Sequence, residues 1–271
     1  MSWALKLIAS LVAVYLLLVL AGYLLQRRFI YYPSPERVLP AQAGMVGVEE
    51  RMLTMPDGVR VVAWHAKAKP GNPTLLYFHG NGGSISGRGS RVRAYTSLGW
   101  GVYMLSYRGY GGSGGAPSET ANVADARIAY GALLQEGVPA ESVIIYGESL
   151  GSGVAARLAT ERKAGGLVLE SPYTSIVDVA RRQFPWVPVG LFLVDRYETE
   201  KVLPQVRMPL LILHGRLDGL IPFEMGEKLL GIANPPKELV AFRDGGHNNL
   251  YAAGNDAQLK VQAWWERVKG Q

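Results

Sequence analysis

The first part of the chain is a long, uninterrupted apolar segment. Residues 7–25 read LIASLVAVYLLLVLAGYLL and contain no charged side chain. As a helix this segment would be about 28 Å long, which matches the hydrocarbon core of a bilayer. Lys6 precedes it, Arg27 and Arg28 follow it, and aromatic residues cluster near its ends, as in membrane-spanning helices. The pattern predicts a transmembrane anchor over residues 1–28 that contacts the lipid bilayer through residues 7–25.

A cleaved signal peptide is the alternative interpretation of this segment. The apolar run is long for a signal peptide, and two arginines follow it where small residues should precede a cleavage site. Residues 41–43, Ala-Gln-Ala, resemble such a site but lie far from the run. We therefore expect an uncleaved, single-pass anchor. Its orientation is left open, because Lys6 favours one side and Arg27, Arg28 and Arg37 favour the other.

Short apolar runs alternate with helical patterns along the rest of the chain. Residues 48–55 and 59–68 flank Met-Pro-Asp-Gly, a turn signal that predicts a β-hairpin. Six continuous apolar runs follow, typical of strands buried on both faces of a parallel sheet: residues 74–80, 101–107, 142–149, 166–172, 209–215 and 238–244. Helical patterns lie near residues 120–136, 150–162, 223–232 and 257–268. The alternation predicts an α/β fold, with a mainly parallel central sheet and helices on both faces, over residues 29–271.

One segment interrupts this alternation. Residues 173–207 contain the apolar stretch QFPWVPVGLFLVDRY and are too long for a plain connection between two strands. We expect a short helical insertion over the edge of the sheet where ligands bind.

The composition narrows the possible chemistry. The chain of 271 residues has no cysteine, which excludes disulfides, thiolate metal sites and cysteine nucleophiles. The net charge is +6, but no run of lysine and arginine exceeds two residues, so we expect no nucleic-acid partner. The glycine-rich FHGNGG lacks the Lys-Ser/Thr ending of a phosphate loop. We expect neither a metal nor an organic cofactor.

Two stretches fit the pattern G-x-S-x-G, which marks a serine on a sharp strand-to-helix turn. Ser149 lies between the apolar run SVIIY and the helical pattern GSGVAARLATER, as that turn requires. Ser113 lies in a glycine-rich loop, and no helical pattern starts before about Thr120. The context predicts Ser149 as the nucleophile.

A serine hydroxyl needs a base to act as a nucleophile. Of the four histidines, His247 lies in the loop RDGGHNNL between the last predicted strand and the last predicted helix. A histidine on such a loop can reach over a nucleophile, so His247 is the candidate base. We expect His79 and His214, which end apolar strands, to be structural, and His65 to be a surface or packing residue.

The base in turn needs a carboxylate to orient its ring. In this kind of fold the chain order is serine, then acid, then histidine. Asp218 follows the run PLLILHG within three residues, which places it on the carboxyl edge of the sheet. Asp244 is the rival but is too close to the candidate base in sequence, and we expect Asp178 and Asp195 to be surface groups. For the oxyanion, the predicted donors are the backbone N–H groups of Leu150 and Asn81.

Several motifs in this order resemble the α/β-hydrolase superfamily, in particular its Bem46-like branch, which is also described as serine aminopeptidase-like. They are FIYYPSPE, FHGNGG, SYRGYGGSGGAPSE, YGESLGSGVA, LESPYTS, LHGRLDGLIPFEMGEKL and GGHNNLY. The resemblance covers the chain from about Phe29 and implies an α/β-hydrolase fold with the triad Ser149, Asp218 and His247. One departure is Ser106, where the family pattern has aspartate, and it affects the local loop rather than the triad.

These observations favour a membrane-anchored serine hydrolase. The expected reaction is cleavage of an ester or thioester, with an acyl or lipid-like substrate and an acyl-serine intermediate. The alternative is a serine peptidase of the aminopeptidase type, in which Glu170, Asp178 or Asp195 would hold the substrate amine. A membrane protein that keeps the fold without catalysis is a third possibility. The oligomeric state is left open.

Overall fold

The computed structural model describes residues 2–252 and 254–270, so the outer limits of the predicted ranges, residues 1 and 271, lie outside the described residues. An eight-stranded sheet is the central element, in the order β10-β9-β8-β7-β4-β6-β3-β2. Its strands are β2 (Glu49–Thr54), β3 (Arg60–Ala66), β4 (Thr74–Phe78), β6 (Gly101–Leu105), β7 (Val143–Glu148), β8 (Gly166–Glu170), β9 (Leu210–Gly215) and β10 (Lys237–Phe242). The predicted hairpin and all six predicted strands are confirmed.

The sheet is mainly parallel, as predicted. Strand β3 pairs antiparallel with both β2 and β6, and every other pairing in this sheet is parallel. Because parallel strands are joined by crossovers, their carboxyl ends gather at one edge, which is where an α/β sheet presents its functional side chains.

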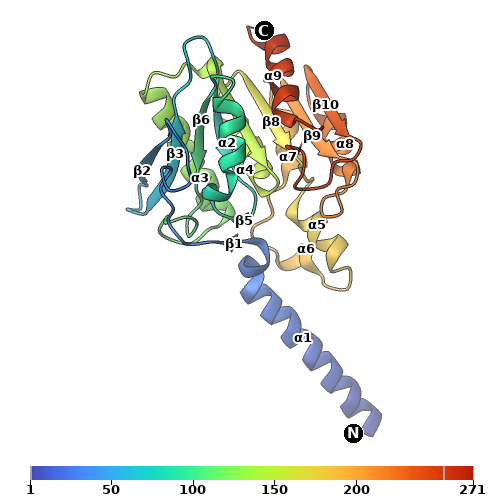
Figure 1. Ribbon diagram of the computed structural model, residues 1–271. Coiled ribbons are helices and arrows are strands. Elements are labelled where there is room, and N and C mark those ends of the chain that lie inside the picture. Colours follow the sequence, from blue (N-terminus) through green and yellow to red (C-terminus); the bar gives the residue numbers. More distant parts are fainter. Residues whose placement is uncertain (1, 253, 271) are drawn as a thin grey trace.

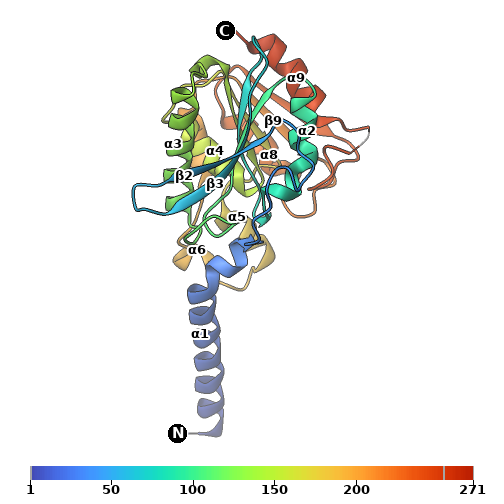
Figure 2. The ribbon, with the colours of Figure 1, turned by 60° about the vertical axis from the view of Figure 1, so that its left-hand side comes forward.

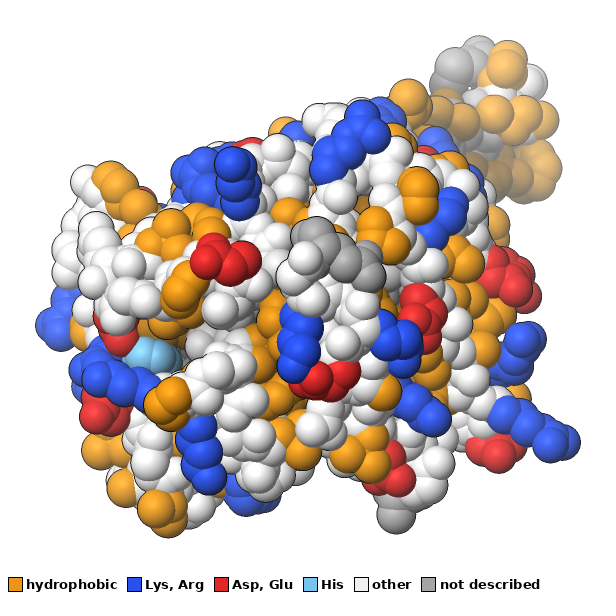
Figure 3. All heavy atoms as spheres, turned by 90° about the horizontal axis from the view of Figure 1, so that it is seen from above, with side chains coloured by type: hydrophobic (Ala, Val, Ile, Leu, Met, Phe, Trp, Pro, Cys, Tyr) orange, Lys and Arg blue, Asp and Glu red, His pale blue; other side chains and the backbone are white. Residues whose placement is uncertain are grey.

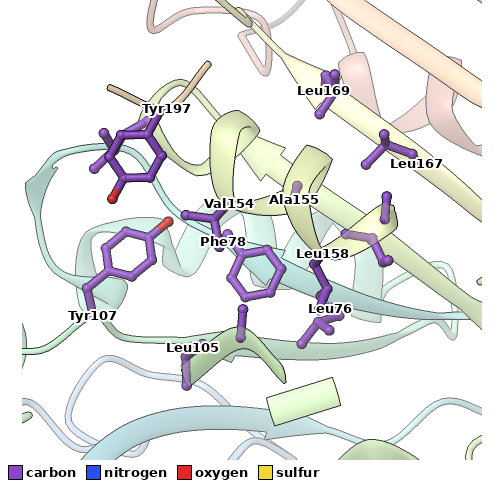
Figure 4. Close-up of a cluster of buried hydrophobic side chains, with 14 of the residues drawn as sticks. Leu76, Phe78, Leu105, Tyr107, Val154, Ala155, Leu158, Leu167, Leu169 and Tyr197 are labelled. Atoms are coloured by element: carbon purple, nitrogen blue, oxygen red, sulfur yellow. The ribbon is translucent and has the colours of Figure 1, made fainter. Parts of the chain in front are cut away.

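Helices cover both faces of the sheet (Figure 1). On one face lie α3 (Glu119–Gln135), α4 (Leu150–Ala159) and α8 (Phe223–Ile232), and on the other lie α2 (Gly89–Thr96) and α9 (Ala257–Val268). Successive residues of a strand serve opposite faces. Leu76 and Phe78 of β4 pack near Val154 of α4 (Figure 4), whereas Leu75 and Tyr77 belong to the cluster under α2 and α9.

Helix α2 is missing from the sequence-based prediction. Its sequence, GSRVRAYT, contains two arginines and begins with glycine and serine, so it has no continuous apolar stripe. Two of its residues, Val92 and Tyr95, supply the apolar contact with the sheet. The side chain of Arg91 is also buried, in an ion pair described below, and a buried arginine cannot be recognised from hydrophobic periodicity.

The insertion over residues 173–207 folds into three short α-helices, α5 (Ile176–Gln183), α6 (Val189–Phe192) and α7 (Thr199–Val202), and a 3-10 helix, η3 (Leu203–Gln205). Helices α5 and α6 lie beside the C-terminal end of helix α1 (Trp3–Ile30) in both ribbon views (Figures 1 and 2). Helix α1 is about 42 Å long, and most of it projects away from the sheet. Its length and hydropathy are sufficient to cross a membrane, a property that signal sequences share.

A second, two-stranded sheet connects the end of α1 to the region of β4. Strand β1 (Tyr32–Pro33) pairs in parallel with β5 (Gly82–Gly83), which follows β4 after a short loop. Ile30 and Tyr31 are buried in the same apolar cluster as α3 and α4. The end of the projecting helix is therefore part of the core.

Substitution of Gly147 tests how tightly β7 meets α4. A Cβ atom at Gly147 would overlap the backbone carbonyl of Gly151, whereas a Cβ atom at Gly131 in α3 would have no neighbour within 4 Å. We expect Gly147→Ala to cost about 1–3 kcal/mol through overpacking, which lowers the thermal midpoint by several degrees. Gly131→Ala, the control, removes a helix glycine and should leave the midpoint unchanged or raise it. Circular dichroism in detergent measures both, and equal midpoints would contradict the packing argument.

Candidate active site

Ser149 is the single residue between β7 and α4. It has φ 49° and ψ −114°, a conformation that non-glycine residues rarely adopt. Two backbone hydrogen bonds hold it there: its N–H donates to the carbonyl of Glu170 at 2.9 Å, and its carbonyl accepts from the N–H of Ser152 at 2.9 Å. The local structure has the strand-turn-helix form that the sequence predicts.

The serine of the other G-x-S-x-G stretch has a different environment. Ser113 is buried, and its Oγ accepts a hydrogen bond from the N–H of Val62 at 2.9 Å. It lies in the loop between β6 and α3, where Gly111, Gly112 and Gly115 have positive φ values. Ser113 therefore fastens a glycine-rich loop to the sheet.

The structure brings three of the predicted site residues into one hydrogen-bonded chain. His247 Nε2 lies 3.0 Å from Ser149 Oγ, and His247 Nδ1 lies 2.8 Å from Asp218 Oδ2. The other carboxylate oxygen, Oδ1, accepts from the N–H groups of Leu220 and Ile221 at 3.0 and 2.8 Å. The three side chains come from loops that follow β7, β9 and β10, at the carboxyl edge of the sheet.

Asp218 is held in its ionised form. Burial of the carboxyl group opposes ionisation, but hydrogen bonds from His214 and His247 outweigh it and hold the pKa of Asp218 well below its ordinary value. His214 Nε2 is 3.5 Å from Asp218 Oδ2 and donates to the carbonyl of Ile221 at 2.9 Å. At neutral pH the ring of His247 therefore faces a fixed negative charge.

The other three histidines have structural environments. His79 packs against Tyr107 and Tyr110 and donates from Nδ1 to the carbonyl of Gly80 at 2.7 Å. Burial lowers its pKa to about 3, so its ring is neutral at physiological pH. His214 is fully buried, and His65 is buried with Nδ1 3.0 Å from a carboxylate oxygen of Glu136.

The prediction for Asp195 was wrong. Its side chain is buried, and Oδ2 accepts hydrogen bonds from Arg27 at 3.0 Å and from Tyr31 at 3.1 Å. Oδ1 accepts from the N–H of Glu119 at the start of α3. These partners are distant in sequence, so local polarity could not reveal the burial. Asp178 is half-buried and accepts hydrogen bonds from two hydroxyl groups at the start of α5.

The two predicted oxyanion donors, Leu150 and Asn81, line the same cavity as Ser149, and Leu150 directly follows Ser149 in the chain. Leu150 is the first residue of α4, whose N-terminus favours negative charge. The side-chain amide of Asn81 donates to the carbonyl of Ile30 at 2.9 Å. The backbone carbonyl of Asn81 accepts from the N–H of Tyr32 and from the hydroxyl of Tyr110. The loop that carries Asn81 is therefore fastened to the end of α1.

The cavity has a volume of about 570 Å³. Its walls come from α1, from the insertion and from the loop after Asp218, and none of its described lining residues is charged. Among residues 2–252 and 254–270, no group of three or more His, Asp or Glu side chains is arranged to hold a metal ion.

Sequence reasoning missed a buried charge network behind Ser149. Glu148 accepts from Arg88 at 3.2 Å, and Glu170 accepts from Arg91 at 2.6 Å. Burial opposes ionisation of Glu148, but the charges of Arg91 and Arg88 hold its pKa well below the ordinary value. The available signal is that two apolar strands both end in Glu-Ser, since a carboxylate at the end of a buried strand needs a partner.

The sequence matches known proteins over most of its length. A family model described as serine aminopeptidase, S33, matches residues 70–197. The uncharacterized protein Rv2307c of Mycobacterium tuberculosis is 36% identical over 83% of this chain and 81% of that protein. The α/β hydrolase domain-containing protein WAV2 of Arabidopsis thaliana is 30% identical over 87% of this chain and 85% of that protein. The chain belongs to the α/β-hydrolase family. The lysophosphatidylserine lipase ABHD12 of Danio rerio is 31% identical over 74% of this chain and 62% of the lipase.

Solved structures give the same fold. The esterase Pf2001 of Pyrococcus furiosus superposes with a TM-score of 0.68 at 22% identity, covering 88% of this chain and 98% of the esterase. The predicted α/β-hydrolase resemblance and fold are thereby confirmed, and the relatives support a hydrolase. At the one departure from the family pattern, Ser106 Oγ donates to the carbonyl of Tyr110 at 2.9 Å and orders the loop.

Removal of Arg91 tests the buried network. Arg91→Met would leave Glu170 as a buried carboxylate without its cation, which costs about 3–5 kcal/mol. Arg127 and Glu161 form a surface pair at the same distance, 2.6 Å, so Arg127→Met is a matched control that should cost less than about 1 kcal/mol. Urea unfolding in detergent measures both losses. Equal losses would mean that the buried pair contributes no more than a surface pair.

Proposed function

We propose that this α/β-hydrolase is a serine hydrolase that cleaves a carboxylic ester or thioester through an acyl-serine intermediate. The observation that supports it is the chain of hydrogen bonds from Ser149 Oγ through His247 to Asp218. A nucleophile, a base and an orienting carboxylate in this order are what acyl transfer at neutral pH requires.

The reaction begins when Ser149 Oγ attacks the carbonyl carbon and His247 Nε2 takes the hydroxyl proton. The tetrahedral intermediate then expels the alcohol or thiol, which takes that proton from His247. In the second half, His247 removes a proton from water, the hydroxide attacks the acyl-serine, and Ser149 regains its proton as the acid leaves. Asp218 keeps the proton of His247 on Nδ1 and stabilises the imidazolium that forms twice per cycle.

The oxyanion of each tetrahedral intermediate is assigned to the backbone N–H groups of Leu150 and Asn81. The N–H group of Leu150, at the start of α4, is suited to a developing negative charge because its orientation is fixed before the reaction. The hydrogen bonds of Asn81 to the end of α1 and to Tyr110 support such a fixed position.

An acyl or lipid-like substrate fits the cavity next to Ser149. The cavity has no charged side chain in its described lining, and the relative ABHD12 is named a lysophosphatidylserine lipase. We assign residues 1–28 as a single-pass membrane anchor and residues 29–271 as the hydrolase domain, with 173–207 as the insertion over the site. The length and hydropathy of α1 support the anchor.

An aminopeptidase activity is the second candidate, because the family model carries that description. Such an enzyme needs a carboxylate that is free to bind the substrate amine. Glu170 is paired with Arg91, Asp195 is paired with Arg27, and Asp178 accepts hydrogen bonds from two hydroxyl groups. Each of the three carboxylates considered for that role therefore has a partner already, and none of them lines the cavity that contains Ser149, which favours the ester or thioester substrate.

The nucleophile is tested by Ser149→Ala, with Ser113→Ala as the control in the second G-x-S-x-G stretch. Membranes that contain each variant are treated with a fluorophosphonate probe and assayed with acyl esters and aminoacyl amides. We expect Ser149→Ala to lose labelling, and its ester hydrolysis to fall by about 10⁶-fold, while Ser113→Ala keeps both. Turnover of the amides alone would establish the peptidase, and a folded wild-type protein without labelling would favour a non-catalytic role.

The role of Asp218 is tested by Asp218→Asn. The amide cannot keep the Nδ1 proton on His247, so we expect kcat to fall by about 10⁴-fold with little change in KM.

The pH dependence of folding stability tests the low pKa of Asp218 in the same variant. Because the pKa of Asp218 is lower in the folded than in the unfolded state, its contribution is present above about pH 4 and is lost as the pH falls further. Wild-type stability should therefore fall more steeply in acid than that of the variant, and parallel curves would contradict this.

A further inference from the structure

The insertion contacts the middle of the segment predicted to cross the membrane. The hydroxyl of Tyr15 donates to the carbonyl of Trp186 at 3.1 Å. Tyr15 lies ten residues before Leu25, the end of the uncharged run, which is about 15 Å along a helix. A hydrocarbon core is about 30 Å thick, so this contact lies near the middle of the bilayer if residues 7–25 span it.

Further contacts follow α1 from its aqueous end toward Tyr15. Arg27 pairs with Asp195 at 3.0 Å. One residue earlier, Gln26 accepts from Val194 N–H at 2.7 Å and donates to the carbonyl of Phe192 at 3.4 Å. The rings of Tyr23 and Phe192 meet edge to face, with centroids 6.4 Å apart. The segment from residue 184 to residue 195 therefore lies along the C-terminal half of α1.

The exposed side chains of this segment are large and apolar. Trp186 is 71% exposed, Leu191 is 88% exposed, and Phe184 and Val194 are also exposed. Large apolar side chains gathered in one exposed segment mark a surface that contacts something apolar. The face opposite α1, seen in Figure 3, instead carries acidic and basic side chains interspersed with apolar ones, as expected for a surface in water.

The cavity of the site lies between these two elements. Leu18, Val19 and Gly22 of α1 line one part, Val179 and Phe184 of the insertion line another, and Ser149 lies in the same lining. An uncharged path therefore connects the lipid-facing side of α1 with the proposed nucleophile.

We propose that residues 184–194 are embedded in the same leaflet as the C-terminal half of α1, and that the acyl chain of a membrane lipid enters the cavity laterally between them. Helix α1 is then a wall of the acyl-binding site as well as an anchor. This inference rests on the proposed function for the reaction at Ser149, whereas the depth of the insertion can be tested without activity.

The acyl site is tested by Gly22→Phe. A Cβ atom at Gly22 would meet nothing within 4 Å, so the phenyl ring would occupy open cavity space. Leu24→Phe, at a 69% exposed position outside the cavity lining, is the control. We expect the ratio of palmitoyl to butyryl ester turnover to fall by at least about tenfold in Gly22→Phe, because a filled pocket excludes methylene groups, and to be unchanged in Leu24→Phe. An unchanged ratio in Gly22→Phe would overturn the acyl site.

Two readouts distinguish failure of the acyl-site proposal from a damaged active site and from failure of the proposed hydrolase function. Labelling of Ser149 by a short fluorophosphonate reports an intact site in each variant, so a loss restricted to long chains can be assigned to the cavity. If the wild-type protein hydrolyses neither ester, the proposed function fails, and the position of the insertion is still decided by depth measurements.

Depth is measured with single cysteines, since the chain has none of its own. A nitroxide is attached to Leu191→Cys, on the insertion, in phosphatidylcholine vesicles. The comparison position is Leu259→Cys, which is 48% exposed on α9, and α9 lies on the side of the molecule away from α1 (Figure 1). Power saturation compares access to oxygen, which concentrates in lipid, with access to a water-soluble nickel complex. We expect the Leu191→Cys label to favour oxygen and the Leu259→Cys label to favour nickel. A nickel preference at both would overturn the embedding.

Discussion

The close approach of β7 and α4 is the constraint on which the site depends. The strand ends and the helix begins within one residue, so the backbone at Gly147 and Gly151 leaves no space for a Cβ atom. Ser149 is therefore forced into a positive φ and lies at the edge of the sheet beside a helix N-terminus. Once this position is fixed, the loops after β9 and β10 need only deliver a carboxylate and a histidine to it, as Asp218 and His247 do.

The two sides of this turn are stabilised differently. The side under α4 is apolar, and Phe78 packs against Val154 there (Figure 4). The side under α2 contains buried ion pairs, since Glu148 pairs with Arg88 and Glu170 pairs with Arg91. A buried ion pair contributes little net stability but restricts geometry, because either partner alone would be an unpaired buried charge. The network therefore serves mainly to orient the ends of β7 and β8. Ser149 follows β7 directly, and its N–H donates to the carbonyl of Glu170 at the end of β8.

Periodicity and turn chemistry were sufficient to predict the strands and the grouping of Ser149, Asp218 and His247, because chain order and strand ends determine which loops meet in this fold. They were insufficient wherever a polar side chain is buried by a partner distant in sequence. Helix α2 was missed because Arg91 takes the place of an apolar contact. Asp195 is buried by partners from α1 and α3. These partners are far away in sequence, so the surrounding residues predicted an exposed side chain. Pairwise burial of charge leaves no periodic signal in one sequence.

The end of α1 connects the proposed membrane segment to the proposed active site without a flexible link. Ile30 and Tyr31 belong to the core, and the carbonyl of Ile30 accepts from the side chain of Asn81, the proposed oxyanion donor. Strand β1 then pairs with β5 just beyond that residue. If α1 spans a bilayer, its depth sets the depth of the site, since a rigid connection transmits position. An enzyme built in this way would meet its substrate at a fixed height above the leaflet, which suits a molecule that is itself held there by an acyl chain.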